Sequence, residues 1–194
     1  MTTLIIPGLD GSREGHWQQW WLDNDPTSQP VHLTELHHPV PEEWEQELFS
    51  AIMDNPGATL VGHSLGAVLV ARVLTRWPYL DLKAALLVAP AEDPSHPRAK
   101  PFTPLPELPL HVPTTLVASR NDPWMSQTRA RKLASLWRSR FVDVGMAGHV
   151  NIESGFGPWP LGLALRDELL DRAVSSRRYQ PGAGAGHPLR QTPG

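Results

Sequence analysis

A serine between two glycines stands in the first half of this 194-residue chain, in the run Gly62-His63-Ser64-Leu65-Gly66. The run follows the apolar segment Thr59–Val61 and precedes a nearly continuous apolar stretch that ends at Leu74. A strand that turns sharply into a helix at a serine exposes the hydroxyl, and the flanking glycines let neighbouring backbone come close. The pattern therefore predicts a nucleophile at Ser64. Without that context, the same five residues would equally fit a plain turn into a core helix.

A serine hydroxyl becomes a good nucleophile only when a base takes its proton. His149 is the candidate base, because it follows the apolar segment Phe141–Val144 in the glycine-bearing run Gly145-Met146-Ala147-Gly148-His149. The carboxyl ends of parallel strands form the edge at which open sheets bind their ligands. His63 adjoins the serine, but we expect its position in the turn to direct its side chain away from the Ser64 hydroxyl.

The acid that orients the base should follow a strand between the serine and His149. Asp122 does so in Ser119-Arg120-Asn121-Asp122-Pro123, directly after the segment Thr115–Ala118, and its carboxylate would hold the His149 tautomer. Asp122 can also cap the helix that follows it. Asp93 is the main alternative, and Asp143 is disfavoured because it lies within the last strand segment, close in sequence to His149.

The stabilisation of an oxyanion requires backbone N–H groups near the serine. The N–H of Leu65 is one expected donor, because this residue follows the nucleophile at a helix N-terminus. The second should come from the loop Pro7-Gly8-Leu9-Asp10-Gly11 after the first strand. Leu9 is the preferred donor there and Asp10 the alternative. Asp10, Trp17 and Trp159 are candidates for lining a substrate pocket.

The lack of cysteine and the placement of the other histidines argue against a disulfide, a metal site or a cysteine nucleophile. No cysteine means no disulfide, thiolate metal site or cysteine nucleophile. His32, His37 and His38 are clustered, but no carboxylate stands at ligand spacing on a common face, so we expect neither a metal nor a cofactor. We expect the histidines in proline-rich or terminal segments to meet solvent: His96, His111 and His187.

Short apolar segments alternate with longer segments of helical period, as in a parallel sheet covered on both faces. The expected strands are Thr3–Ile6, Val31–Leu33, Thr59–Val61, Ala84–Val88, Thr115–Ala118 and Phe141–Val144. Apolar residues four apart predict helices, with stripes at Trp44, Leu48 and Ile52, at Leu133 and Trp137, and at Leu161, Leu165 and Leu169. The helix 64–74 is apolar nearly all round and should be buried.

Two segments depart from this alternation. The stretch Ala91–Pro113 is rich in proline, so we expect an irregular crossover that overhangs the site. Residues 175–194 carry glycine and proline without periodic apolar residues, which predicts a disordered tail after a single domain over 1–174.

The composition narrows the function classes. Hydrophobic residues make up 40%, charged residues 19%, and the formal net charge is -3, so nucleic acid is not an expected partner. The sequence shows neither a signal peptide nor an apolar run long enough to span a bilayer. These features predict a cytoplasmic protein with a small-molecule substrate, no membrane association and an oligomeric state that the sequence does not indicate.

Several stretches resemble the small α/β-hydrolases that include retinoblastoma-binding protein nine and bacterial serine hydrolases similar to it. The matching stretches are Gly15–Gln18, Gly62–Gly66, Ser119–Pro123, Arg129–Ala134 and, most specifically, Gly148–Pro160. The resemblance implies a compact α/β-hydrolase fold without a large lid, and a triad at Ser64, Asp122 and His149. The family's animal namesake binds a pocket protein through a motif that contains cysteine, so that partner is not expected here.

Together these features predict six parallel strands in the order 2-1-3-4-5-6 and an esterase-type serine hydrolase that forms an acyl-enzyme. The alternative is a catalytically weak protein that uses the same fold to bind a partner. A different reaction at the same triad, such as perhydrolysis or carbon–carbon bond cleavage, is also compatible with the sequence.

Overall fold

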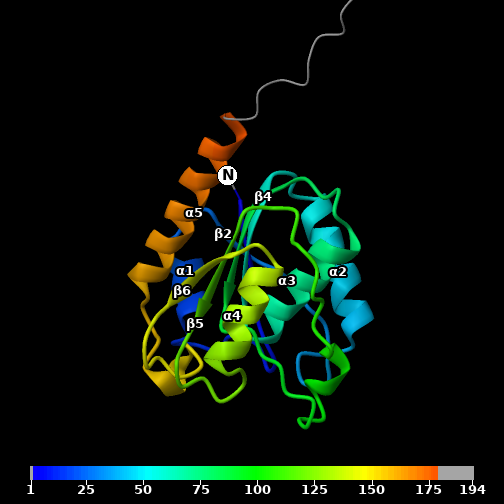
Figure 1. Ribbon diagram of the computed structural model, residues 1–194, viewed down its shortest axis with the longest axis vertical. Coiled ribbons are helices and arrows are strands. Elements are labelled where there is room, and N and C mark those ends of the chain that lie inside the picture. The colour runs from blue at the N-terminus through cyan, green and yellow to red at the C-terminus, as the bar shows by residue number, and fades with distance from the viewer. Residues whose placement is uncertain (1, 179–194) are drawn as a thin grey trace, which may run out of the picture.

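The structure, a computed structural model, describes residues 2–178 as one six-stranded parallel sheet with helices on both faces (Figure 1). The strands are β1 (Thr3–Ile6), β2 (Ser28–Pro30), β3 (Ala58–His63), β4 (Leu82–Val88), β5 (Thr114–Ala118) and β6 (Arg140–Asp143). The α-helices are α1 (Trp17–Asn24), α2 (Pro41–Met53), α3 (Leu65–Arg76), α4 (Gln127–Leu136) and α5 (Pro160–Arg178). Two short 3₁₀ turns are η1 (Lys100–Phe102) and η2 (Ile152–Ser154).

The strand order is β2-β1-β3-β4-β5-β6, as predicted, and all neighbours run parallel. From β1 the chain moves to the edge strand β2 and then crosses back to β3 on the other side of β1. The loops after β1 and β3 therefore lead away in opposite directions, which opens a crevice at the carboxyl ends of these two strands. The register places Ile6 opposite Gly62, so both loops leave the sheet at the same level.

The core has one apolar layer on each face of the sheet. Helices α2, α3 and α4 cover one face, where the indoles of Trp44 and Trp137 are fully buried. Helices α1 and α5 cover the other face, where Trp17 and Trp21 are fully buried (Figure 1). Burial of four indoles contributes several kcal/mol to folding by removing apolar area from water.

The crossover from β4 to β5 contains η1 but no α-helix, as the prolines predict. It is nevertheless anchored, because Phe102, Leu105 and Leu110 are buried in the same layer as α2 and α4. The indole N–H of Trp137 donates to the carbonyl oxygen of Pro106 at 2.7 Å. The proline-rich segment is thus a packed wall of the molecule.

The edge strand differs from its prediction. β2 covers Ser28–Pro30, three residues before the expected Val31–Leu33. An edge strand pairs on one side only, so it tolerates polar residues and a proline. Val31 and Leu33 instead follow the end of β2 and bury their side chains in the core.

The last helix also differs in two details. Leu165 and Leu169 are buried as expected, but Leu161 is 57% exposed, because it lies in the first turn of α5, away from the sheet. The helix extends to Arg178, so the first four residues of the expected tail are helical. The rest of that segment, 179–194, lies outside the described residues. Within residues 2–178, no helix combines the length and hydrophobicity needed to cross a bilayer.

Candidate active site

Ser64 lies in a strained turn between β3 and α3, with φ 57° and ψ -123°. A residue other than glycine adopts such angles only when its surroundings enforce them. The enforcing contacts are close backbone approaches: a Cβ on Gly62 would lie 2.6 Å from the Gly66 carbonyl oxygen, and one on Gly66 would overlap the carbonyl oxygen of Pro7. The Ser64 N–H also donates to Val88 O at 3.1 Å, which holds the turn against β4.

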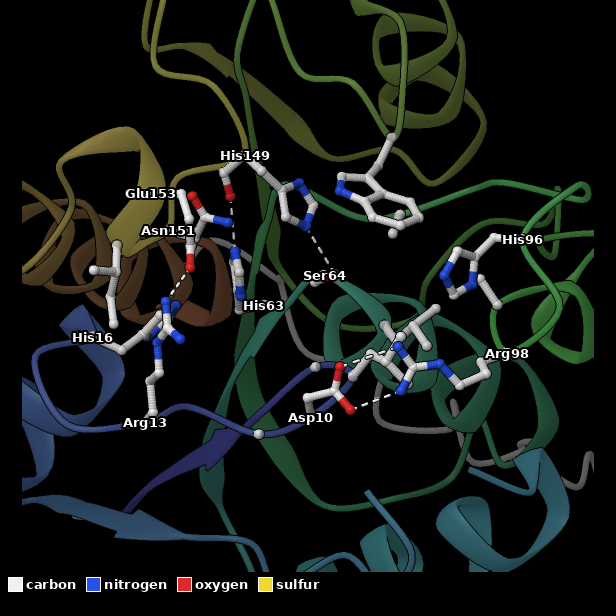
Figure 2. A pocket seen from close by; sticks show the side chains of 18 residues that line it. Asp10, Arg13, His16, His63, Ser64, His96, Arg98, His149, Asn151 and Glu153 are labelled. Atoms are coloured by element: carbon white, nitrogen blue, oxygen red, sulfur yellow. Dashed lines mark hydrogen bonds and ion pairs between the residues drawn. The ribbon is translucent and has the colours of Figure 1, made fainter. Parts of the chain in front are cut away.

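The imidazole of His149 points toward Ser64 (Figure 2), and its other nitrogen faces Asp122. His149 Nε2 is 2.8 Å from Ser64 Oγ, and His149 Nδ1 is 2.9 and 3.0 Å from the two carboxylate oxygens of Asp122. The side chains of His149 and Asp122 are 8% and 3% exposed, so the pair is shielded from water. Asp122 Oδ1 also accepts the Trp124 N–H at 2.9 Å, which fixes the carboxylate in the turn.

The loops that carry Asp122 and His149 are bound to each other. Asn121 Oδ1 accepts the Gly148 N–H at 2.8 Å, and Ser119 Oγ accepts the Ala147 N–H at 3.0 Å. These side-chain contacts link the end of β5 to the loop after β6. These hydrogen bonds therefore hold the positions of Asp122 and His149 relative to each other.

The loop after β1 passes directly over the serine. A Cβ on Gly8 would lie 2.8 Å from Ser64 Cβ and 3.3 Å from Ser64 Oγ. The Asp10 N–H is occupied by Leu36 O at 3.0 Å, whereas among the described residues no acceptor is bound to the Leu9 N–H. Of the two expected donors in this loop, Leu9 is therefore the one that is free. Leu65 is the first residue of α3, where a backbone N–H has no partner within the helix.

A cavity of about 320 Å³ opens at Ser64. One end is formed by the proline-rich segment with His96 and Arg98, and the other by the loops that carry His16 and Glu153 (Figure 2). The ring of Trp124 lies beside that of His96 at the first end. The lining residues are Gly8, Leu9, Asp10, Gly11, Arg13, His16, His63, Ser64, Leu65, Ala91, His96, Arg98, Ala99, Trp124, His149, Asn151, Ile152 and Glu153. This set includes the carboxylates of Asp10 and Glu153 and the guanidinium groups of Arg13 and Arg98, so two negative charges face two positive ones.

Each guanidinium group is paired with a carboxylate from another loop. Arg98 binds Asp10 with both nitrogens, at 2.8 and 3.2 Å, and this contact lowers the pKa of the Asp10 carboxyl. His37 also reaches Asp10, at 2.6 Å. Arg13 pairs with Glu153 on the opposite side. The loop after β1 is thus tied to the proline-rich segment at one end and to the His149 loop at the other.

Two further histidines stand in a row with the base. The ring centroids of His16 and His63 are 5.0 Å apart, as are those of His63 and His149. Burial lowers the pKa of His16 to about 4, and burial together with the neighbouring His149 holds the pKa of His63 well below its usual range. Both rings are therefore neutral near pH 7. His63 Nε2 donates to the His149 carbonyl oxygen at 2.9 Å, away from Ser64 Oγ as expected.

The two alternative acids lie elsewhere. The Asp93 carboxylate accepts hydrogen bonds from Ser95 and the His96 N–H. Asp143 binds Arg120, Gln127 and the Gly145 N–H. Neither contacts the His149 ring, so of the three carboxylates Asp122 is the one at hydrogen-bond distance from it.

Three residues occupy positions that the sequence did not predict. Trp17 and Trp159 do not line the cavity; both are buried behind it in an aromatic cluster, because their large rings fill the layer between α1, α5 and the sheet. His96 is half-buried at the cavity, with its ring centroid 5.2 Å from that of Trp124, because the 3₁₀ turn after it folds the proline-rich segment inward. The expectation that it meets solvent was wrong.

Sequence reasoning also missed His16, Arg98 and Trp124 as cavity residues. The stretch Gly15–Gln18 did carry a signal, since it is one of those that resemble the small hydrolases. Nothing in the local pattern around Arg98 distinguishes it from a surface arginine. Among residues 2–178, no group of three or more His, Asp or Glu side chains is arranged to hold a metal ion.

A model of the family described as "Serine hydrolase" matches residues 3–168. The chain belongs to this serine hydrolase family. A search of the curated proteins found no match.

Several solved structures of hydrolases share this fold. A YdeN-like hydrolase from Pectobacterium atrosepticum is 35% identical over 89% of this chain and 91% of its own, with a TM-score of 0.80. The ydeN gene product of Bacillus subtilis is 19% identical over 88% of this chain and 98% of its own, with a TM-score of 0.72. Est1E from Butyrivibrio proteoclasticus, solved with ferulic acid, is 11% identical over 91% of this chain and 89% of its own, with a TM-score of 0.62. The last two similarities concern the fold alone.

Proposed function

We propose that this serine hydrolase cleaves a small ester-like or acyl substrate through Ser64, His149 and Asp122. The observation that carries the proposal is the position of His149, with Nε2 at 2.8 Å from Ser64 Oγ and Nδ1 at 2.9 Å from Asp122. A base that is both within reach of a hydroxyl and oriented by a carboxylate is the arrangement that activates a serine.

The first half of the reaction forms the acyl-enzyme. Ser64 Oγ attacks the substrate carbonyl carbon while His149 Nε2 takes the hydroxyl proton, and Asp122 stabilises the imidazolium. The negative charge that develops on the carbonyl oxygen is accepted by the N–H groups of Leu65 and Leu9. When the tetrahedral intermediate collapses, His149 gives its proton to the leaving group.

The second half repeats these steps with water. His149 takes a proton from a water molecule, whose oxygen attacks the acyl carbon, and the carboxylic acid leaves as Ser64 regains its proton. Every proton transfer is assigned to His149, and the proposed reaction uses no cofactor. A cavity of about 320 Å³ is of the size that takes a small molecule.

Labelling with a fluorophosphonate tests the proposal, because only an activated serine reacts with it. The wild-type protein should be labelled once, and Ser64→Ala should be folded, unlabelled and slower in ester hydrolysis by on the order of 10⁶-fold in kcat. Equal labelling or equal hydrolysis by the two proteins would contradict the proposal. A panel of p-nitrophenyl esters of increasing chain length would then define the acyl preference.

The binding-protein alternative has no observation in its favour. A protein that only holds a partner does not need a hydroxyl, an imidazole and a carboxylate in hydrogen-bond contact. A wild-type protein that resists the fluorophosphonate at every pH would favour that alternative.

A further inference from the structure

His16 is a buried cavity residue that the proposed reaction does not use. Its side chain is part of the cavity wall, on the side of Arg13 and Glu153 and across Ser64 from His96 and Arg98 (Figure 2). The residue is only 5% exposed. Such a buried polar ring needs hydrogen-bond partners for both of its nitrogens.

One of the two nitrogens has a partner within the protein. His16 is the N-cap of α1, and its Nδ1 accepts the backbone N–H of Gln18 at 3.1 Å. A nitrogen that accepts a hydrogen bond carries no proton, so in the neutral ring the proton is on Nε2. The helix cap thereby fixes the tautomer of the ring.

The other nitrogen has no partner. Among the described residues, no acceptor is bound to His16 Nε2, and this atom is not one of the fully enclosed unpaired polar atoms of the structure. Since His16 is otherwise buried and lines the cavity, its Nε2–H meets solvent in the cavity. Because burial lowers the pKa of His16 to about 4, the ring stays neutral near pH 7 and offers a single hydrogen-bond donor.

We propose that His16 Nε2–H donates a hydrogen bond to the substrate, so that the enzyme prefers esters with an acceptor oxygen near the scissile carbonyl. This inference rests on the proposed function, because it concerns the substrate of the same serine. A site with a fixed buried donor discriminates against an analogue that lacks the acceptor, since the donor then stays desolvated and unpaired. An alkyl ester would therefore be a poorer substrate than an ether or hydroxy ester of the same shape.

Two pairs of probes, each with the same shape, locate the acceptor. On the acyl side the pair is p-nitrophenyl methoxyacetate and p-nitrophenyl butanoate, which differ by one oxygen in place of a methylene. On the alcohol side the pair is 2-methoxyethyl acetate and butyl acetate. In each pair, kcat/KM for the oxygen-bearing ester is divided by kcat/KM for its partner. Comparison of this ratio between variants cancels the intrinsic reactivities of the two esters.

Two variants separate the donor from the helix cap. His16→Asn keeps a side-chain acceptor for the Gln18 N–H but loses the distal donor, and asparagine is a good N-cap. His16→Gln places an amide N–H near the position of Nε2 but loses the cap. For His16→Asn the ratio should fall about tenfold in one of the two pairs with little change in Tm. For His16→Gln the ratio should stay within about twofold of wild type while Tm falls.

Three results would overturn the inference. One is an unchanged ratio with unchanged rates in both pairs for His16→Asn; another is an equal loss of rate on both members of both pairs, which would assign His16 to water or to the architecture of the site. The third is a ¹⁵N NMR spectrum in which His16 carries its proton on Nδ1 at pH 7, and this measurement needs no substrate. Failure of the proposed function itself would look different, since the wild-type protein would then hydrolyse none of the four esters and resist the fluorophosphonate.

Discussion

The side chain of His63 donates a hydrogen bond from Nε2 to the backbone carbonyl oxygen of His149 at 2.9 Å. His63 immediately precedes Ser64, so this contact links the turn that carries Ser64 to the loop that carries His149. The two residues are 86 positions apart in the chain. The distance of 2.8 Å between Ser64 Oγ and His149 Nε2 thus depends on a contact behind the reacting groups.

Replacement of His63 should therefore disturb catalysis through the position of His149. His63→Leu removes the donor and leaves the carbonyl of His149 unpaired, so the loop should shift and kcat should fall roughly tenfold with little change in KM. His63→Gln can still donate and should recover most of kcat. Steady-state kinetics on one ester decides this, and equal rates for the wild-type and Leu proteins would contradict it.

Asp122→Asn tests the orienting acid. The amide still accepts the Trp124 N–H, so the turn should persist, but it cannot stabilise an imidazolium and can favour the wrong tautomer of His149. We expect kcat to fall by on the order of 10³–10⁴. Asp93→Asn is the matched control and should leave kcat unchanged, since among the described residues the Asp93 carboxylate binds only groups of its own loop. The reverse pattern in the two variants would identify Asp93 as the acid.

Gly8→Ala tests the approach of the loop after β1 to the serine. The added Cβ would lie 2.8 Å from Ser64 Cβ, so the loop or the nucleophile must move and the Leu9 N–H with it. A displacement of about 1 Å at a reacting centre costs on the order of 10²-fold in rate. Gly57→Ala is the control: it has φ +73° and open space, so it should cost about 1 kcal/mol of stability and no activity. A fully active Gly8→Ala enzyme would argue against Leu9 as a donor.

Because two buried histidines have lowered pKa values, the free energy of unfolding should depend on pH. In the unfolded chain an imidazole has a pKa near 6.5, whereas in the folded protein the pKa of His16 is about 4. As the pH falls from about 6.5 to about 4, the unfolded state takes up a proton that the folded state does not. The free energy of unfolding should therefore decrease, by roughly 3 kcal/mol from His16 alone, and His63 acts in the same direction.

Urea denaturation between pH 7.5 and 5 measures this effect, above the range in which carboxylates titrate. His16→Asn lacks one of the two buried imidazoles whose pKa is lowered, so its stability should depend less steeply on pH than that of the wild-type protein. Parallel slopes for the two proteins would show that His16 is protonated in the folded state or is not buried in solution.

The sequence alone determined the sheet and the identity of the triad candidates, because those features are local. Apolar segments of strand length, a glycine on each side of Ser64 and polar residues at strand ends are readable along the chain. The strand order was expected from the resemblance to the small α/β-hydrolases, together with right-handed crossovers. The edge strand was misplaced because pairing on one side leaves little constraint on its side chains.

The tertiary structure decided which side chains face the cavity. Asp10 and Arg98 are 88 positions apart, and Arg13 and Glu153 are 140 apart, so no local pattern could pair them. Trp17 and His16 are neighbours in sequence, yet the indole fills the core while the imidazole faces the cavity. Whether a ring belongs to the core or to the site depends on the volume left between packed layers, and that volume exists only once the sheet and its helices have assembled.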